Sequence, residues 1–132
     1  MTWKLNDQEF NSVLSLPSQD RYEYFVKRVA DWQEIWSLAN VEGWVLYGDK
    51  SGQELVPVWP HPRFAEACAQ GEWSDCEPRL IELDEWLDQW TPGMIEDKRL
   101  VVVFPTPDMR STVVTPERLE ADLRAELSLI ED

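Results

Sequence analysis

The side chains best suited to binding chemistry gather in residues 57–63, whose sequence is PVWPHPR. His61, the only histidine of the chain, stands between two prolines, which restrict its backbone and so the direction of its ring. An imidazole titrates near neutral pH and could act as a general base or a metal ligand, but a lone histidine cannot make a typical His-rich zinc site. We interpret His61 as structural or surface polar, with recognition of a ligand as the alternative.

Two tryptophans and an arginine flank this histidine in ways that suit recognition. Trp59 and Trp73 lie beside turns and polar residues, where an indole can anchor a protein, a sugar or another flat ligand. Packing in the core is the favoured alternative for both, because large aromatic side chains are usually well buried. Arg63 could bind a carboxylate or a phosphate. The predicted partner- or ligand-binding residues are therefore Trp59, His61, Arg63 and Trp73.

Catalytic groups are harder to find in the sequence. Cys76 could be a nucleophile if it lay near His61, but its neighbours Asp75 and Glu77 disfavour a thiolate, and Cys68 lies between two alanines like a core residue. The carboxylates of residues 82–88 fit a solvated helix face better than a metal site. We predict no catalytic residue, no metal and no cofactor, so an enzyme is the less favoured class, with a carboxylate-only hydrolase left open.

Composition sets the broad class of the protein. The chain has 132 residues and 43% apolar residues, which suits one globular domain over residues 1–132. Its formal net charge of −14 opposes a nucleic-acid backbone and favours solubility or a basic partner. No stretch is apolar enough to span a membrane and no secretory signal is present, so we expect a cytoplasmic protein with reduced cysteines.

Periodic apolar residues predict helices near both ends. Asn6 can cap a short helix that Pro17 ends, and a second helix begins near Ser18 with Arg21, Lys27 and Arg28 facing solvent. Thr115 and Pro116 can start the last helix as cap and first-turn residue. The inner faces of these three helices carry Phe10, Val13 and Leu14, then Tyr22, Phe25, Val26 and Val29, then Leu119, Leu123, Leu127 and Ile130.

Strand signals occupy the middle of the chain. Residues 44–47, turn residues 49–52 and a return over 53–58 predict a hairpin in a meander. Pro57 lacks an amide hydrogen, so this return strand should lie at an edge or bend there. The apolar run 100–104 predicts a central strand covered on both faces, with residues 112–114 antiparallel to it.

Shorter helices are expected between the strands. One follows Pro62 with Phe64, Ala65, Cys68 and Ala69 inside, and Gly71 ends it. After an extended piece near residues 80–83, Asp84 caps a helix whose inner face holds Trp86, Leu87 and Trp90 and which Pro92 and Gly93 break. The predicted fold is α+β, a single domain with flanking helices and a mostly antiparallel sheet, a mixed sheet being the alternative.

Several short motifs resemble a known family. They are Gly43-Trp44 before the hairpin, the segment PVWPHP at 57–62, the Phe64-Ala65 pair and the segment VFP at 103–105. Together they are similar to a bacterial family, domain-of-unknown-function family 2750, over nearly the whole chain, and PVWP is the most specific mark. The resemblance implies a small bacterial domain without an established activity, and it transfers no catalytic residue.

The sequence thus favours a non-catalytic interaction module, such as an adaptor, an inhibitor or an antitoxin-like protein, that binds a basic protein partner. The alternative is a small-molecule sensor or small hydrolase with a pocket near Trp59, His61, Arg63 and Trp73.

Overall fold

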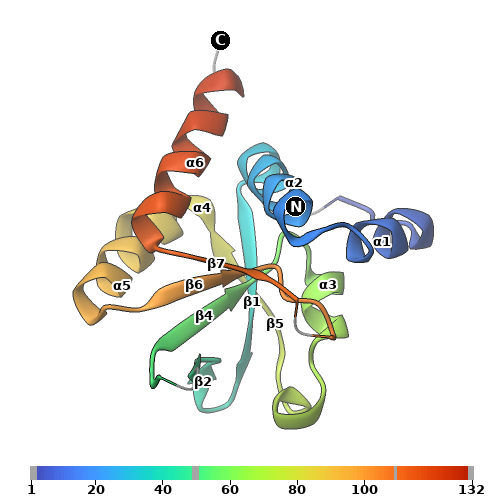
Figure 1. Ribbon diagram of the computed structural model, residues 1–132, viewed down its shortest axis with the longest axis horizontal. Helices are drawn as coiled ribbons and strands as arrows, with labels where there is room; N and C mark the ends of the chain where they lie inside the picture. Colours follow the sequence, from blue (N-terminus) through green and yellow to red (C-terminus); the bar gives the residue numbers. More distant parts are fainter. Residues whose placement is uncertain (1–2, 49–50, 109, 131–132) are drawn as a thin grey trace.

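The chain folds as an α+β protein, as predicted (Figure 1). The computed structural model describes residues 3–48, 51–108 and 110–130. The helices are α1 (Asp7–Leu14), α2 (Ser18–Trp32), α3 (Pro62–Ala67), α4 (Leu83–Glu85), α5 (Thr91–Asp97) and α6 (Pro116–Ile130), with a 3₁₀ turn η1 (Gly71–Trp73) and a π-helical turn η2 (Trp86–Trp90). The strands are β1 (Glu34–Asn40), β2 (Gly43–Trp44), β3 (Tyr47–Gly48), β4 (Glu54–Val58), β5 (Glu77–Glu82), β6 (Leu100–Val103) and β7 (Thr112–Val114).

The strands form two small sheets rather than one. Strands β2, β1 and β5 make a three-stranded antiparallel sheet in that order, and β3, β4, β6 and β7 make a four-stranded one. All strand pairs are antiparallel except β4 and β6, so the second sheet is mixed. Paired backbone bonds between Trp36 and Trp59, of 2.8 and 2.9 Å, join β1 to the end of β4 and so connect the two sheets.

Strand β6 is the central strand that its apolar run predicts. It lies between β4 and β7, and Val101, Val102 and Val103 are all buried although they alternate between the two faces. Pro57 does not end the neighbouring strand β4. Its carbonyl accepts from Ser37 Oγ at 2.7 Å, on the side away from β6, so its missing donor leaves the β4–β6 ladder intact.

The predicted strand over residues 44–47 is divided between the two sheets. Trp44 pairs with β1, and Tyr47 pairs with Leu55 of β4 in the hairpin. Between them Val45 still donates its amide to Leu38 O at 2.9 Å, and its side chain is buried. Asp49 and Lys50 of the predicted turn lie outside the described residues, and Gly52 has the positive φ, 86°, expected of it.

The helix ends in the middle of the chain differ from prediction. Asp84 lies inside the first turn of α4 and does not cap it, because β5 runs directly into the helix. The Leu83 amide at the start of α4 donates to Gln33 O at 3.0 Å. Pro92 and Gly93 do not break the helical path, which continues through the π turn into α5, where Pro92 follows directly after the wider turn. Gly71 does not end α3, which stops at Ala67, but starts η1.

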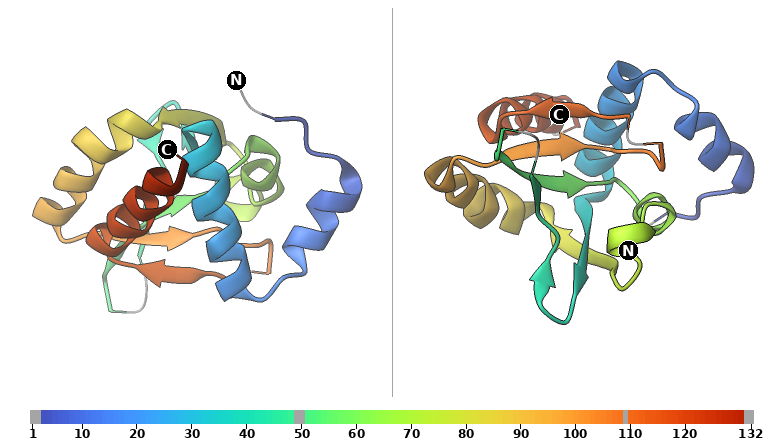
Figure 2. Two further views of the ribbon diagram at one scale, coloured as in Figure 1. Left: turned by 90° about the horizontal axis from the view of Figure 1, so that it is seen from above. Right: turned by 60° about the horizontal axis from the view of Figure 1, so that its bottom comes forward.

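The outer helices follow the prediction closely, with two exceptions. Ile130, predicted on the inner face of the last helix, is 48% exposed, because the last turn of α6 projects beyond the core (Figure 1). Asn6 Oδ1 accepts from Glu9 N at 2.8 Å, and Thr115 Oγ1 accepts from Arg118 N at 3.1 Å, so both predicted caps are confirmed. Helices α2 and α6 lie side by side in both views of Figure 2. The prediction that Arg21 faces solvent is wrong, because its guanidinium is buried and donates to backbone carbonyls.

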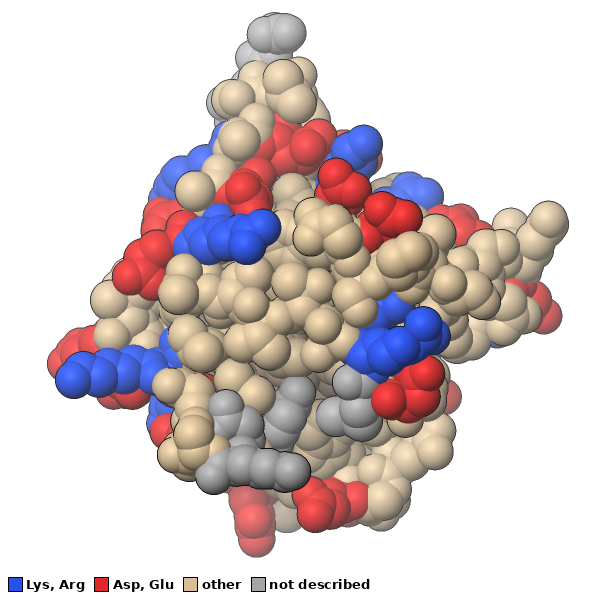
Figure 3. Space-filling view, in the orientation of Figure 1, with Lys and Arg blue, Asp and Glu red and all other residues tan. Residues whose placement is uncertain are grey.

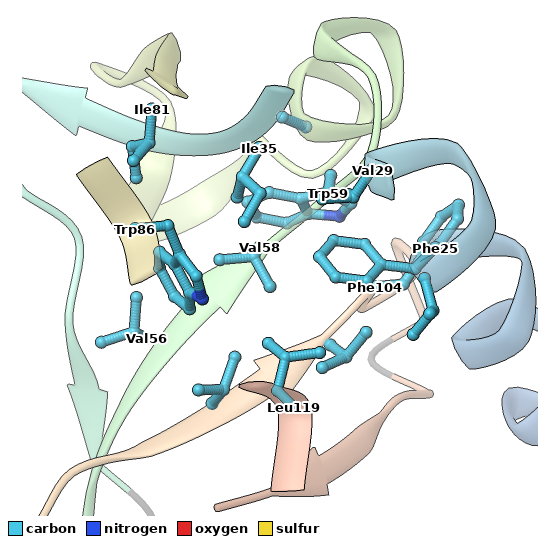
Figure 4. Packing of buried hydrophobic residues seen from close by; sticks show 14 of the residues in the cluster. Phe25, Val29, Ile35, Val56, Val58, Trp59, Ile81, Trp86, Phe104 and Leu119 are labelled. Atoms are coloured by element: carbon cyan, nitrogen blue, oxygen red, sulfur yellow. The ribbon is translucent and has the colours of Figure 1, made fainter. Parts of the chain in front are cut away.

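One core draws side chains from both sheets and from the helices. Trp59 at the end of β4 and Trp86 in the π turn are fully buried, and they face Ile35 and Val58 in the packed interior (Figure 4). Leu119 of α6 closes this core from the other side. Burial of such large aromatic and aliphatic groups stabilises the fold by about 2 kcal/mol each.

Candidate functional site

Trp59 is a core residue and presents no surface. Its side chain is 0% exposed, and its indole Nε1 donates to Pro105 O at 2.9 Å. The ring meets that of Trp73 edge to face, with the centroids 6.4 Å apart. Core packing, the favoured alternative for Trp59, therefore describes it, because a fully buried indole cannot contact a partner in this conformation.

His61 holds two segments together. Its Nδ1 accepts from the Arg63 amide at 3.1 Å and so caps α3, and its Nε2 lies 2.8 Å from Trp3 O. Because Nδ1 accepts, the ring is neutral and Nε2 carries the hydrogen that it donates to Trp3 O. Burial lowers the pKa of His61, with the Arg63 charge acting in the same direction. Both ring nitrogens thus have hydrogen-bond partners within the protein, and His61 has the structural role that was the favoured interpretation.

Arg63 lies close to His61 but points at the N-terminal segment. It donates to Leu5 O at 3.1 Å and to Asp7, and its guanidinium stands 4.2 Å from the centroid of the Phe10 ring. Of the four predicted residues, Trp59 and Trp73 are in ring contact with each other, and Trp73 lines two hollows of the surface.

Trp73 stands between two hollows beside the segment that links the sheets. The larger, of about 470 Å³, is lined by Leu46, Gly48, Cys68, Gln70, Glu72, Trp73 and Pro107. The smaller, of about 320 Å³, is lined by Asn40, Glu42, Gly43, Trp44, Val45, Leu46, Glu72, Trp73 and Cys76. They share Leu46, Glu72 and Trp73 and therefore adjoin, and we call them together the Trp73 groove.

Local structure explains how the groove forms. Asn40 Oδ1 accepts from the Glu42 amide at 2.8 Å and closes the turn between β1 and β2, where Gly43 has a φ of 130° that favours glycine. The 3₁₀ turn η1 then presents Glu72 and Trp73 opposite Trp44. The sequence analysis placed Trp44 in the core and did not single out Glu42 or Glu72. Only the folded turns bring these three residues together at one hollow.

The Trp73 groove is lined by acidic and aromatic side chains. Its lining contains two indoles, two glutamates and no lysine or arginine among the described residues. Just outside, the guanidinium of Arg79 already lies 5.6 Å from the Trp44 ring, in cation–π contact. Indole faces and carboxylates both attract organic cations. This groove can therefore bind an ammonium or a guanidinium group.

The two cysteines that line the groove are poor nucleophiles. Cys68 is buried with its Sγ 3.3 Å from Pro105 O, and burial raises its pKa to about 11. Burial and a hydrogen bond to Asp75 also raise the pKa of Cys76. Both are thiols at neutral pH, so neither provides the thiolate that nucleophilic catalysis needs. Among the described residues no group of three or more His, Cys, Asp or Glu side chains is placed to hold a metal ion.

A third hollow lies next to the π turn and shares Trp44 and Leu46 with the Trp73 groove. It measures about 450 Å³ and is lined by Trp44, Leu46, Val56, Gln89, Trp90, Gly93, Met94, Asp97 and Arg99. Trp90 meets Trp44 edge to face, at 4.9 Å and 87°, and stacks on Trp86 at 5.6 Å. The π turn sets this arrangement, with Thr91 N donating to Trp86 O, and π turns are frequent at functional sites.

One face of the molecule has a neutral centre. In Figure 3 the Lys, Arg, Asp and Glu side chains lie around this centre, over β6 and β7, which shows none of them. Within the described part of the chain, no helix has both the length and the apolar character that crossing a membrane requires.

Fold and site together define a small α+β domain with two linked sheets and an acidic, aromatic groove at their junction. The family described as Protein of unknown function (DUF2750) matches residues 22–123, and the chain belongs to this family. No curated protein matches the chain.

Proposed function

We propose that the chain is a non-catalytic interaction module that binds a basic segment of a protein partner in the Trp73 groove. One observation carries the proposal. Trp44, Trp73, Glu42 and Glu72 line one hollow without a basic side chain among its described lining residues. A lysine or arginine placed there gains cation–π and ionic contacts at once.

The charge of the whole molecule supports the same partner. A formal net charge of −14 attracts basic proteins over about one Debye length and speeds their encounter. The same charge repels nucleic acid. Specificity then comes from the groove, because a rigid indole fixes the position of the cation better than diffuse charge does.

The test is fluorescence anisotropy with a short dye-labelled peptide that contains arginine and lysine, at low and moderate salt. Trp73→Ala should weaken binding about tenfold, which corresponds to about 1.4 kcal/mol. Glu42→Gln with Glu72→Gln should weaken it similarly and reduce its salt dependence.

The matched control removes the same charge from outside the groove. Glu96 on α5 and Glu117 on α6 are exposed and line none of the hollows beside Trp73. Glu96→Gln with Glu117→Gln should leave affinity nearly unchanged. Equal losses in the two double variants would mean that net charge alone binds the peptide, and the groove would carry no recognition.

The hollow beside the π turn favours a second function, as a sensor of a small flat ligand. Two perpendicular indoles, Trp44 and Trp90, form a corner that suits an aromatic ring, with Met94 as an adaptable wall. Indole itself is the probe for this function, and it should raise the melting temperature by mass action. The sensor would be excluded here if saturating indole left the melting temperature unchanged.

A further inference from the structure

The N-terminal residues cross the surface as an extended strap. The strap comprises residues 3–7, from Trp3 to the first residue of α1. It lies on side chains of α2 and α3 and of the residues that flank them. These are Arg28, Trp32, His61 and Arg63, and we call them the strap site.

Two side chains of the strap site form hydrogen bonds with the backbone of the strap. His61 Nε2 bonds to Trp3 O at 2.8 Å, and Arg63 Nη1 donates to Leu5 O at 3.1 Å. These carbonyls are two residues apart, the repeat at which an extended chain presents groups on one side. The strap is thus held as a peptide ligand is held, through its main chain.

The strap site also has an aromatic slot. Trp3 is only 9% exposed, and its ring centroid lies 5.8 Å from that of Trp32 and 4.8 Å from that of His61. The guanidinium of Arg28 stands 4.8 Å from the Trp3 ring. A single indole therefore touches three side chains of the site, which is the contact pattern of an anchor residue.

Two arginines of the strap site pair with carboxylates of the N-terminal segment. Arg63 forms an ion pair with Asp7, and Arg28 forms one with Glu9 at 2.9 Å, just beyond the strap. Both guanidinium groups of the strap site thus meet a carboxylate of the N-terminal segment, on a molecule whose net charge is −14. A peptide that replaces this segment needs carboxylates a few residues after the anchor to pair with them, so the site fits an extended acidic peptide.

The strap lies at the edge of the main core. Trp3 is not a member of the buried cluster that links the sheets and helices, and Leu5 is a partly buried side chain that packs against the outside of that cluster. The indole Nε1 of Trp3 is buried without a hydrogen-bond partner, so the strap fits its own site imperfectly. The family match covers residues 22–123, which contain the whole strap site and none of the strap. The matched part of this chain therefore contains the site, and the strap lies in the segment before it.

We propose that the strap site recognises an extended acidic peptide with an aromatic anchor from a partner protein, and that the strap is its intramolecular competitor. A tethered strap acts at an effective concentration in the millimolar range. The identical strap of a second copy gains nothing against it. Only a segment that fits better, for example one without the unpaired indole N–H, displaces it. This site is separate from the Trp73 groove and does not depend on the function proposed for that groove.

The test uses the full chain and a dye-labelled peptide with the sequence of residues 1–12. Trp3→Ala empties the aromatic slot while leaving the main core intact, so this variant should bind the peptide at least about tenfold more tightly than the wild type. Adding Arg63→Ala to Trp3→Ala should remove that gain. Arg99→Ala, which deletes a surface arginine elsewhere, is the matched control and should retain it.

Two outcomes would overturn the proposal. One is a folded Trp3→Ala chain that does not bind the peptide, and the other is binding that is indifferent to Arg63. If Trp3→Ala does not fold, the wild type provides the test by nuclear magnetic resonance. An excess of the peptide with phenylalanine in place of its tryptophan should then move the Trp3 indole N–H resonance, and a resonance that stays in place sinks the idea.

Discussion

At the scale of single residues, His61 connects two separate segments of the fold. It caps α3 through Nδ1 and holds the strap through Nε2, so one neutral imidazole fixes two segments. Protonation adds a hydrogen to Nδ1, which can then no longer accept from the Arg63 amide. Burial and the Arg63 charge disfavour the cation and keep the pKa of His61 below its usual 6.5, against the opposing pull of the Trp3 carbonyl, Glu34 and Glu9.

We therefore predict a loss of stability on mild acidification. Below the unfolded pKa of about 6.5 the unfolded chain binds a proton that native His61 does not, so the free energy of unfolding falls as pH decreases toward the lowered native pKa. Above about 6.5 the full contribution is present. Urea denaturation from neutral pH down to pH 5 measures this effect.

Two variants isolate His61 from the many carboxylates. His61→Asn keeps a side chain that can cap α3 but does not titrate, so its stability should fall less between pH 7 and pH 5 than that of the wild type. His61→Ala should cost about 1 kcal/mol at neutral pH through the lost cap. If wild type and His61→Asn follow the same pH profile, His61 is not the titrating group.

Sequence predicts some residue roles and misses others for physical reasons. Asn6 and Thr115 act within three residues of themselves, so local sequence suffices for both caps. Arg21 looks exposed by helical periodicity, yet its partners Leu16, Phe104 and Arg110 are mostly distant in sequence. Only the folded chain brings those carbonyls to the guanidinium, whose burial lowers its pKa.

At the scale of elements, the path from α4 to α5 departs most from prediction. Pro92 and Gly93 indicate a break, but the π turn absorbs one extra residue and the helix continues past both. A π turn has no reliable local signal, since it depends on the packing of its tryptophans. Trp86 and Trp90, which stack on each other, were consequently predicted only as core, although Trp90 lines the third hollow.

Helix α5 ends in a strained conformation that yields a prediction. Lys98 is exposed and has a φ of 60°, and Arg99 N donates to Met94 O at 2.9 Å as in a Schellman motif. A left-handed conformation costs a residue other than glycine about 1–2 kcal/mol, and the greater freedom of glycine in the unfolded chain offsets part of the gain. Lys98→Gly should stabilise the protein by about 0.5–1 kcal/mol in urea denaturation.

The control for this substitution is Lys98→Ala, which removes the same charge but keeps the left-handed strain. Alanine should therefore give no gain, and the difference between glycine and alanine measures the backbone term alone. Equal stability of the two variants would show that charge, and not the conformation of Lys98, decides the effect.

Pairing between the elements is only partly predictable. The hairpin of β3 and β4 and the antiparallel pair of β6 and β7 join strands that are close in sequence, and both were expected. The parallel pairing of β4 with β6 joins residues more than forty positions apart, such as Leu55 and Leu100, and no local sequence pattern indicates it. The Trp73 groove likewise depends on segments distant in sequence, because residues 40–48 and 68–76 come together to line it.

At the scale of the whole molecule, charge acts on folding and binding in opposite ways. The formal net charge of −14 repels itself in the folded state, where the charges lie closer together than in the unfolded chain. The ion pairs of the described residues are exposed or partly exposed and contribute at most about 1 kcal/mol each. Net repulsion should therefore outweigh them.

Added salt should accordingly stabilise the fold and weaken the proposed basic partner. At about 0.15 M salt, screening acts beyond about 8 Å, which reduces long-range repulsion more than close ion pairs. The urea midpoint should rise with sodium chloride while the affinity for the arginine- and lysine-containing peptide falls. A midpoint that falls with salt would mean that the ion pairs outweigh the net charge. An affinity that ignores salt would mean that the Trp73 groove binds through its indoles alone, and the glutamates would lose their proposed role.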